Sequence, residues 1–187
     1  YPFKKDGYKL VQAPYSGMEH QSAVTYGNRF ANGYLERDWT GVGISTRFDF
    51  IIIHESGHEW FGNAVSAADV SDMWIHEGWT TYLECLYVEY MYGHDDYLKY
   101  TNAYKKKVQN KTPIITQHGV NAEPPQDMYF KGALFLNTLR SIVNDDQKIR
   151  DADAGFFEND STAQMVHVLP FPAGENEVPG RGAEGRP

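Results

Sequence analysis

Five consecutive residues, His54-Glu55-Ser56-Gly57-His58, constrain the fold of this chain more than any other segment. In a helix, side chains four residues apart lie on one face about one turn apart, so both imidazoles can reach a single cation. Glu55 is rotated by about 100° from His54 and faces a free position beside that cation. The segment therefore predicts a helix with a metal-binding face.

Glu77 follows the second histidine after eighteen intervening residues and provides a third ligand. Two neutral imidazoles and one carboxylate are typical of catalytic zinc sites, which keep the fourth position for water, whereas structural sites are usually closed by four protein ligands rich in cysteine. The chain has a single cysteine, Cys85, so a closed cysteine site is excluded. We expect His54, His58 and Glu77 to bind one Zn²⁺ ion.

Composition excludes several other classes of function. The chain has 187 residues, enough for one buried core, and its formal net charge of −8 argues against a nucleic-acid partner. No apolar stretch approaches the roughly 18 residues that span a bilayer, so we expect no membrane span. The chain begins at Tyr1 without an initiator methionine, and we expect it to be a piece of a longer protein. Nothing in the sequence indicates a compartment.

The β signal is confined to the first part of the chain. Alternating residues rich in Val, Tyr and Thr between Tyr8 and Tyr26 predict two strands, interrupted at Pro14 to Gly17. Residues 27–46 mix Gly, Asn, Asp and aromatic residues without a period and predict an irregular loop. We therefore expect an α+β fold, mostly helical, with a short N-terminal β segment.

Four helices are predicted after this segment from apolar periodicity, caps and breakers. The helix around the histidines should be buried nearly all round, because apolar residues flank the motif so broadly. After the last helix the chain is rich in Pro and Gly and has no period, which predicts an irregular tail rather than a second domain. The expected ranges are 47–63, 71–92, 95–108 and 126–143 for the helices, 1–144 for the folded domain and 145–187 for the tail.

Several motifs in the same order resemble those of the aminopeptidase N family of zinc peptidases, which are gluzincins. The H-E-x-x-H motif with its downstream glutamate is followed by Trp60-Phe61-Gly62-Asn63, as in that family. Ser16-Gly17-Met18-Glu19-His20, on the expected second strand, is similar to the family's G-x-M-E-N signature, and Tyr129-Phe130-Lys131-Gly132, opening the last helix, is similar to Y-x-K-G. His20 replaces the Asn of the signature and Ser16 its first Gly, so the hydrogen bonding of this strand departs from the family pattern.

This resemblance implies a thermolysin-like zincin catalytic domain, present here in part over residues 1–144, with the flanking domains of a longer protein missing. It implies a zinc-dependent aminopeptidase that hydrolyses the N-terminal peptide bond of peptides with a free N-terminus. Glu55 would be the general base and Tyr129 the donor to the oxyanion. Glu19 would bind the substrate ammonium, with the backbone of Gly17 and Met18 holding the substrate main chain.

Two other functions stay open. A thermolysin-like endopeptidase would share the metal site, although the Glu19 segment argues against it. A zinc-binding but catalytically silent fragment is the other, because an active site needs walls that position the substrate. Glu84, which shares a helix face with Glu77, either orients a zinc-bound imidazole or has an ordinary polar role. His76 should be turned away from the metal and be structural.

Overall fold

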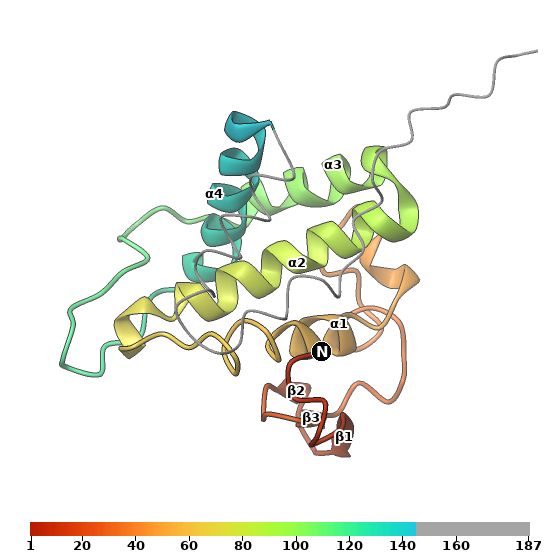
Figure 1. The fold of residues 1–187 in the computed structure, drawn as a ribbon. Helices are drawn as coiled ribbons and strands as arrows, with labels where there is room; N and C mark the ends of the chain where they lie inside the picture. The colour runs from red at the N-terminus through yellow and green to blue at the C-terminus, as the bar shows by residue number, and fades with distance from the viewer. Residues whose placement is uncertain (145–187) are drawn as a thin grey trace, which may run out of the picture.

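A computed structural model describes residues 1–144, and the predicted tail lies outside this described part. Helix α2 runs through the middle of the fold and contacts α1 on one side and α3 and α4 on the other, while a small sheet lies beyond α1 (Figure 1). The elements, in chain order, are β1 (Lys9–Gln12), β2 (Gly17–Met18), β3 (Ala23–Tyr26), α1 (Phe50–Gly57), α2 (Trp74–Tyr92), α3 (His94–Ala103) and α4 (Asp127–Val143), with short 3₁₀ turns at Ser45–Arg47, Val70–Asp72 and Tyr104–Lys106. The fold is mostly helical with a small sheet, as expected.

The sheet has three strands, in the order β1-β3-β2, where the sequence predicted two. Strand β1 pairs with β3 in parallel and β2 pairs with β3 antiparallel, with Gly17 opposite Tyr26 and Met18 opposite Thr25. Strand β2 has only two residues, too few to show an alternating pattern of its own, so the sequence analysis did not separate it from the strand that follows. Because β2 is an edge strand, its outer side is not paired within the sheet.

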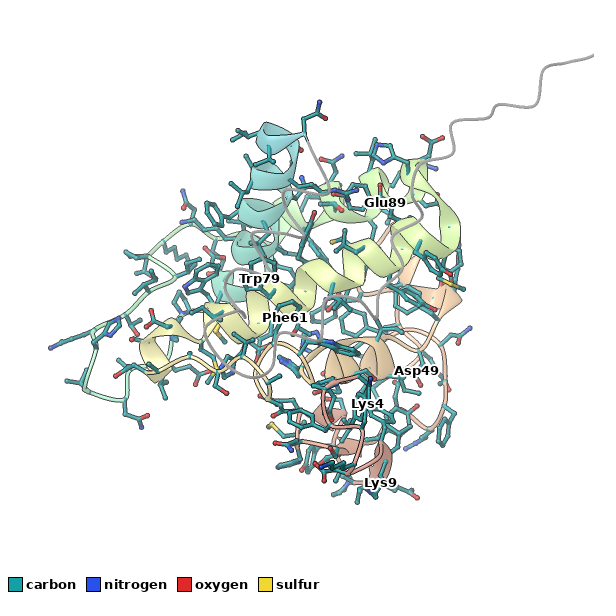
Figure 2. All side chains as sticks on the ribbon, viewed as in Figure 1. Lys4, Lys9, Asp49, Phe61, Trp79 and Glu89 are labelled. Carbon is teal, nitrogen blue, oxygen red and sulfur yellow. The ribbon has the colours of Figure 1, made fainter. Side chains whose placement is uncertain are left out.

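Helix α1 is much shorter than the predicted range 47–63. It begins after Asp49, whose side chain accepts a hydrogen bond from the backbone N–H of Ile52 at 3.2 Å and caps the helix (Figure 2). It ends at Gly57, and the chain then turns, with Gly62 at a φ of 130°. Burial is also less complete than predicted, because Ile52 and Ile53 are partly exposed.

The turn that follows α1 packs against α2. The ring of Phe61 stacks on that of Trp79, with centroids 5.1 Å apart and planes inclined by 19° (Figure 2). Residues 58–65 are therefore a folded connection rather than a continuation of the helix, and their backbone hydrogen bonds include Asn63 N–H to His58 C=O at 3.0 Å. This connection lies directly beside the predicted metal ligands.

Helices α2 and α4 approach each other at two glycines. A Cβ atom added at Gly132 would lie 2.9 Å from the Cα of Gly78, so the two backbones are in contact. Only residues without a side chain allow helices to pack this closely. The contact joins the helix that carries Glu77 to the helix that carries Tyr129.

The remaining helices differ only at their ends from the prediction. The predicted helix over 95–108 is α3 (His94–Ala103) followed by the 3₁₀ turn, and the helix predicted from residue 71 begins as α2 at Trp74 after its own 3₁₀ turn. Both differences come from turns whose 3₁₀ geometry continues the helical pattern in sequence. In the described part of the chain no helix combines the length and apolarity needed to cross a bilayer.

The segment from residue 27 to residue 46 is an irregular loop, as predicted, and Asp38 organises it. The Asp38 carboxylate accepts hydrogen bonds from the Ser45 hydroxyl at 2.6 Å and from the backbone N–H groups of Gly43 at 2.6 Å and Thr40 at 3.1 Å. Burial raises the pKa of Asp38, but these hydrogen bonds outweigh it and bring the pKa to about 2. The ordered loop holds Trp39 against Phe50, at the start of α1, with ring centroids 5.8 Å apart.

Candidate metal centre

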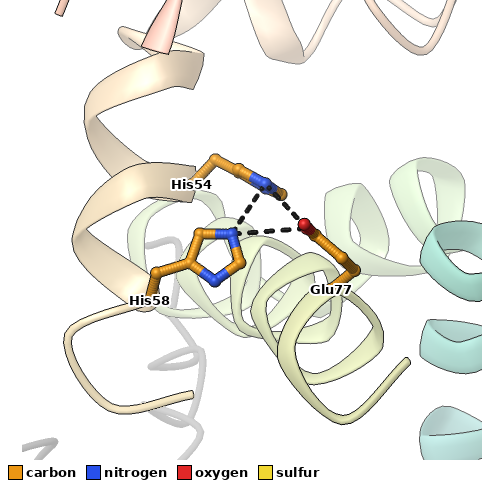
Figure 3. Close-up of side chains that lie close together, drawn as sticks. All are labelled: His54, His58 and Glu77. Carbon is orange, nitrogen blue, oxygen red and sulfur yellow. Dashed lines mark hydrogen bonds and ion pairs between the residues drawn. The ribbon is translucent and has the colours of Figure 1, made fainter. Parts of the chain in front are cut away.

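The three predicted ligands meet between α1 and α2 (Figure 3). The Nε2 atoms of His54 and His58 are 3.2 Å apart, and Glu77 Oε2 lies 3.4 Å from His54 Nε2 and 3.3 Å from His58 Nε2. The side chains of His58 and Glu77 are about nine-tenths buried or more. His54 lies in the last turn of α1, His58 follows directly as the C-cap of that helix, and Glu77 lies in the first turn of α2.

These distances fit a cation with tetrahedral coordination. Ligand atoms at about 2.0–2.1 Å from a zinc ion would lie about 3.3–3.4 Å from one another, and the three observed separations are 3.2, 3.3 and 3.4 Å. Glu77 Oε2 is also buried without a hydrogen-bond partner among the described residues. A buried carboxylate oxygen without a hydrogen bond is costly unless a cation neutralises it. The residues present therefore fit zinc.

The protonation of the carboxylates suits metal binding. Burial raises the pKa of Glu77, but the imidazoles of His54 and His58 outweigh burial and hold the pKa well below its usual range. Glu77 is thus the anion that ligation requires. For Glu55 burial prevails, and its pKa lies above the usual range despite the same two imidazoles. A carboxylate with a raised pKa is suited to accept and return a proton.

Glu84 orients the first histidine. Its Oε1 atom accepts a hydrogen bond at 2.7 Å from Nδ1 of His54, which leaves Nε2 facing the other two ligands. Its Oε2 atom accepts hydrogen bonds from the hydroxyl groups of Tyr100 at 3.2 Å and Tyr104 at 2.5 Å, both in the segment from α3 onward. The side chain of Glu84 is 1% exposed. Of its two possible roles, the structure therefore favours contact with a ligand imidazole.

The second histidine is oriented by the turn that follows α1. Nδ1 of His58 donates to the carbonyl oxygen of Phe61 at 2.8 Å and lies 3.2 Å from the hydroxyl of Thr80. The carbonyl fixes the tautomer, because it can only accept, and this leaves Nε2 of His58 with a lone pair for a metal. His76, by contrast, accepts the backbone N–H of Ala67 at 2.8 Å, which agrees with the structural role expected for it.

Glu55 lies beneath strand β2 and is covered by it. A Cβ atom added at Gly17 would lie 2.4 Å from Oε1 of Glu55, so only glycine leaves room for this carboxylate. Glu55 itself is 7% exposed. The structure thus brings the predicted base and the strand that carries the G-x-M-E-N-like segment into direct contact.

Glu19 lies close to the predicted base and to the second histidine. Ligand atoms of Glu19, Glu55 and His58 are all within 4.8 Å of one another. Glu19 follows β2 rather than lying in a strand, which corrects the expectation. Met18, in the edge strand, is 44% exposed, and His20, which replaces the Asn of the family signature, is paired through Nδ1 with Thr25 Oγ1 at 2.6 Å.

Tyr129 is in the first turn of α4, as predicted, on the side of His54. The two ring centroids are 6.2 Å apart. Burial, together with the charge of Glu77, raises the pKa of Tyr129 and keeps its hydroxyl protonated. A cavity of about 210 Å³ opens beside these residues and is lined by Ser16, Tyr34, Trp39, Phe50, Ile51, His54, Glu55, Thr81, Glu84, Gln126, Tyr129 and Phe130.

A family model decides the classification of the chain. The model described as the peptidase family M1 domain matches residues 1–167. The chain belongs to peptidase family M1. The match includes every residue of the candidate site and agrees with the resemblance to aminopeptidase N that the motifs indicated.

Aminopeptidases are among the curated relatives of the chain. Aminopeptidase N of Mus musculus is 27% identical over 161 residues, which cover 78% of this chain and 16% of the relative. Endoplasmic reticulum aminopeptidase 1 of Mus musculus is 27% identical over 157 residues, covering 78% of this chain and 17% of the relative. The chain therefore spans about one sixth of the length of these relatives.

Solved M1 structures share the fold. A two-domain M1 zinc metallopeptidase mutant bound to L-tryptophan aligns with a TM-score of 0.56 and 23% identity over 86% of this chain and 30% of that chain. An M1 zinc metallopeptidase from Deinococcus radiodurans aligns with a TM-score of 0.51 and 24% identity over 71% of this chain and 27% of that chain. Membership of M1 implies zinc as the metal.

Two polar side chains near the M1 site were missed by the sequence analysis. Glu59, directly after the second histidine, is fully buried, and Asn63 donates to the carbonyl oxygen of Glu19 at 2.8 Å. Both lie in the stretch that was predicted as a continuous helix, a prediction that does not include their contacts with residues 19–22. A signal was available in the Trp60-Phe61-Gly62-Asn63 motif, which the resemblance used only as a marker of the family.

Proposed function

We propose that this chain is the catalytic part of a zinc aminopeptidase that removes N-terminal residues from peptides. His54, His58 and Glu77 would hold one Zn²⁺ ion in a thermolysin-like zincin arrangement. The observation that carries the proposal is the cluster of Glu19, Glu55 and His58 within 4.8 Å. It sets Glu19, a carboxylate that is not one of the three ligands, beside the expected base and a metal ligand, where the amine of a substrate could reach it.

In this mechanism each nearby side chain has one task. Bound zinc supplies Lewis acidity and lowers the pKa of water toward about 7. Glu55 accepts the proton of the attacking water and returns it to the departing amine, which its raised pKa favours. Tyr129 stays protonated and donates its O–H to the carbonyl oxygen as negative charge develops there.

Substrate binding is assigned to the segment beside Glu55. Glu19 binds the free ammonium group by a charge-assisted hydrogen bond. The outer edge of β2, at Gly17 and Met18, accepts the substrate main chain as an added strand, since the sheet leaves this edge unpaired. A neighbouring M1 structure was solved with L-tryptophan bound, which supports a site for a free amino group.

The decisive experiment compares a free and a blocked amine on the zinc-loaded chain. We expect hydrolysis of an amino-acid anilide and loss of hydrolysis when the substrate amine is acetylated. Glu55→Gln should retain zinc and lose nearly all turnover, because it removes the base without removing a ligand. Equal cleavage of acetylated and free substrates, or cleavage within a blocked peptide, would instead support the endopeptidase.

One competing function is a zinc-binding but catalytically silent fragment. The chain spans 16% of the length of aminopeptidase N from Mus musculus, so turnover by this chain alone has to be measured. Stoichiometric zinc with no turnover on a broad panel of amino-acyl substrates would identify a silent zinc-binding fragment. We also propose that the domain ends near residue 144, and limited proteolysis should then leave a stable fragment ending there.

A further inference from the structure

The turn that follows α1 carries two side chains that reach back to the segment bearing Glu19. We propose that Glu59 and Asn63 are positioning residues that hold the amine-binding carboxylate at a fixed place beside the metal helix. The inference rests on the proposed function and deepens it, because it names the residues that set the selectivity for a free amine. Neither residue is a metal ligand, base or oxyanion donor.

Asn63 fixes one end of the segment. Its side-chain amide donates to the main-chain carbonyl oxygen of Glu19 at 2.8 Å, across 44 residues of sequence. The bond is made to the backbone of Glu19 and not to its carboxylate. It therefore leaves the carboxylate free for a ligand while it holds the Cα atom in place.

Glu59 fixes the other end. Its Oε1 accepts the backbone N–H of Ser22 at 2.6 Å, and its Oε2 accepts the hydroxyl of Tyr1 at 3.3 Å. The side chain is 0% exposed, and a buried carboxylate is stable only when donors surround it. Ser22 has a φ of 57°, a conformation that non-glycine residues seldom adopt without such support. Residues 19–22 are thus held at both ends by one turn.

The carboxylate of Glu19 needs this support. Within residues 1–144 it has no hydrogen bond or ion pair of its own, and the side chain is partly exposed. The placement of its backbone therefore matters for where the carboxylate lies. A positioned charge binds an ammonium group better than a mobile one, because less freedom is lost on binding.

The same turn also orients a metal ligand. Its Phe61 carbonyl accepts from Nδ1 of His58 at 2.8 Å, and the backbone N–H of Asn63 donates to the carbonyl of His58 at 3.0 Å. One short segment thus fixes both the imidazole beside the reacting bond and the carboxylate beside the substrate amine. The separation between this imidazole and this carboxylate determines that cleavage occurs one residue from the N-terminus of the substrate.

The test uses Asn63→Asp, which keeps the shape of the side chain and removes the donor. On the zinc-loaded chain we expect KM for a free-amine anilide to rise about tenfold with kcat within about threefold of the unmodified chain. Calorimetry should show that the variant also loses its preference for binding an amino-acid amide over the N-acetyl form of that amide, with zinc content unchanged. Asn102→Asp, the same substitution at an exposed position of α3, is the matched control and should alter neither quantity.

A second pair of variants covers the case in which Asn63→Asp does not fold. Glu59→Gln keeps an acceptor for the Ser22 N–H and should retain most of the preference for the free amine, whereas Glu59→Leu removes the acceptor and should lose it. Unchanged KM and amine preference in folded Asn63→Asp or Glu59→Leu would overturn the inference. A loss of zinc together with an equal fall in turnover of every substrate would also overturn it, because the turn would then act only by orienting His58. If the unmodified chain itself binds both forms equally, the proposed function fails, and this inference fails with it.

Discussion

Replacing Gly17 with alanine should separate catalysis from folding. The added Cβ atom would lie 2.4 Å from Oε1 and 2.8 Å from Cγ of Glu55, whereas ordinary contacts begin at 3.4 Å. The carboxylate must therefore move by about 1 Å, and a displacement of that size can cost about 100-fold in rate. We expect kcat for an amino-acid anilide to fall about 100-fold in Gly17→Ala.

The fold and the metal should survive the same change. Glu55 is not a ligand, and its carboxylate is the mobile end of a side chain, so it can move without displacing α1. Zinc content measured by atomic absorption and the midpoint of thermal unfolding should match those of the unmodified chain. Gln12→Ala, on the exposed strand β1, is the control for a substitution in the sheet. A folded, zinc-loaded Gly17→Ala with unchanged kcat would refute the close contact between β2 and Glu55.

Three further changes test other contacts of the fold. Gly132→Ala should lower the free energy of unfolding by about 1–3 kcal/mol in urea titrations, because its Cβ would meet the Gly78 backbone at 2.9 Å; an unchanged midpoint would contradict this packing. Glu84→Gln should weaken zinc binding by about 10- to 100-fold in competition with a chelator, since it removes the charge that faces the His54 imidazole. Asp38 has a pKa lowered from 3.8 to about 2, so its contribution to stability is present above about pH 4 and is lost as the pH falls toward 2. The difference in unfolding midpoint between the unmodified chain and Asp38→Asn should accordingly shrink over that range, and a constant difference would show that the charge of Asp38 is not involved.

The metal-binding face was predictable because its spacing is local. Two histidines four residues apart lie on one face of any helix, and the three candidate ligands do meet in the structure at 3.2 to 3.4 Å. Tyr129 was placed correctly at the start of a helix by the same kind of short-range pattern. The catalytic and binding roles of these residues stay predictions until the variants are measured.

What the sequence could not predict are contacts between distant segments. The predicted helix over 47–63 ends at Gly57, because the residues after it make tertiary contacts that a helix would not allow, such as the Asn63 bond to Glu19. Apolar residues continue with helical spacing past the true end, and periodicity cannot register that change. Strands β2 and β3 were predicted as one strand for a related reason, since the two residues of β2 are defined as a separate strand by their pairing with β3 alone.

The contacts of Glu84 couple metal binding to the stability of α3. The carboxylate bridges the His54 imidazole and two tyrosine hydroxyls, one of them on α3 and the other immediately after it. By thermodynamic linkage, a ligand that binds only the ordered arrangement stabilises every segment on which that order depends, by about 2.7 kcal/mol at a free concentration 100 times Kd. Zinc should therefore slow amide hydrogen exchange in α3, more than 15 residues along the chain from the last ligand, and chelation should reverse that protection.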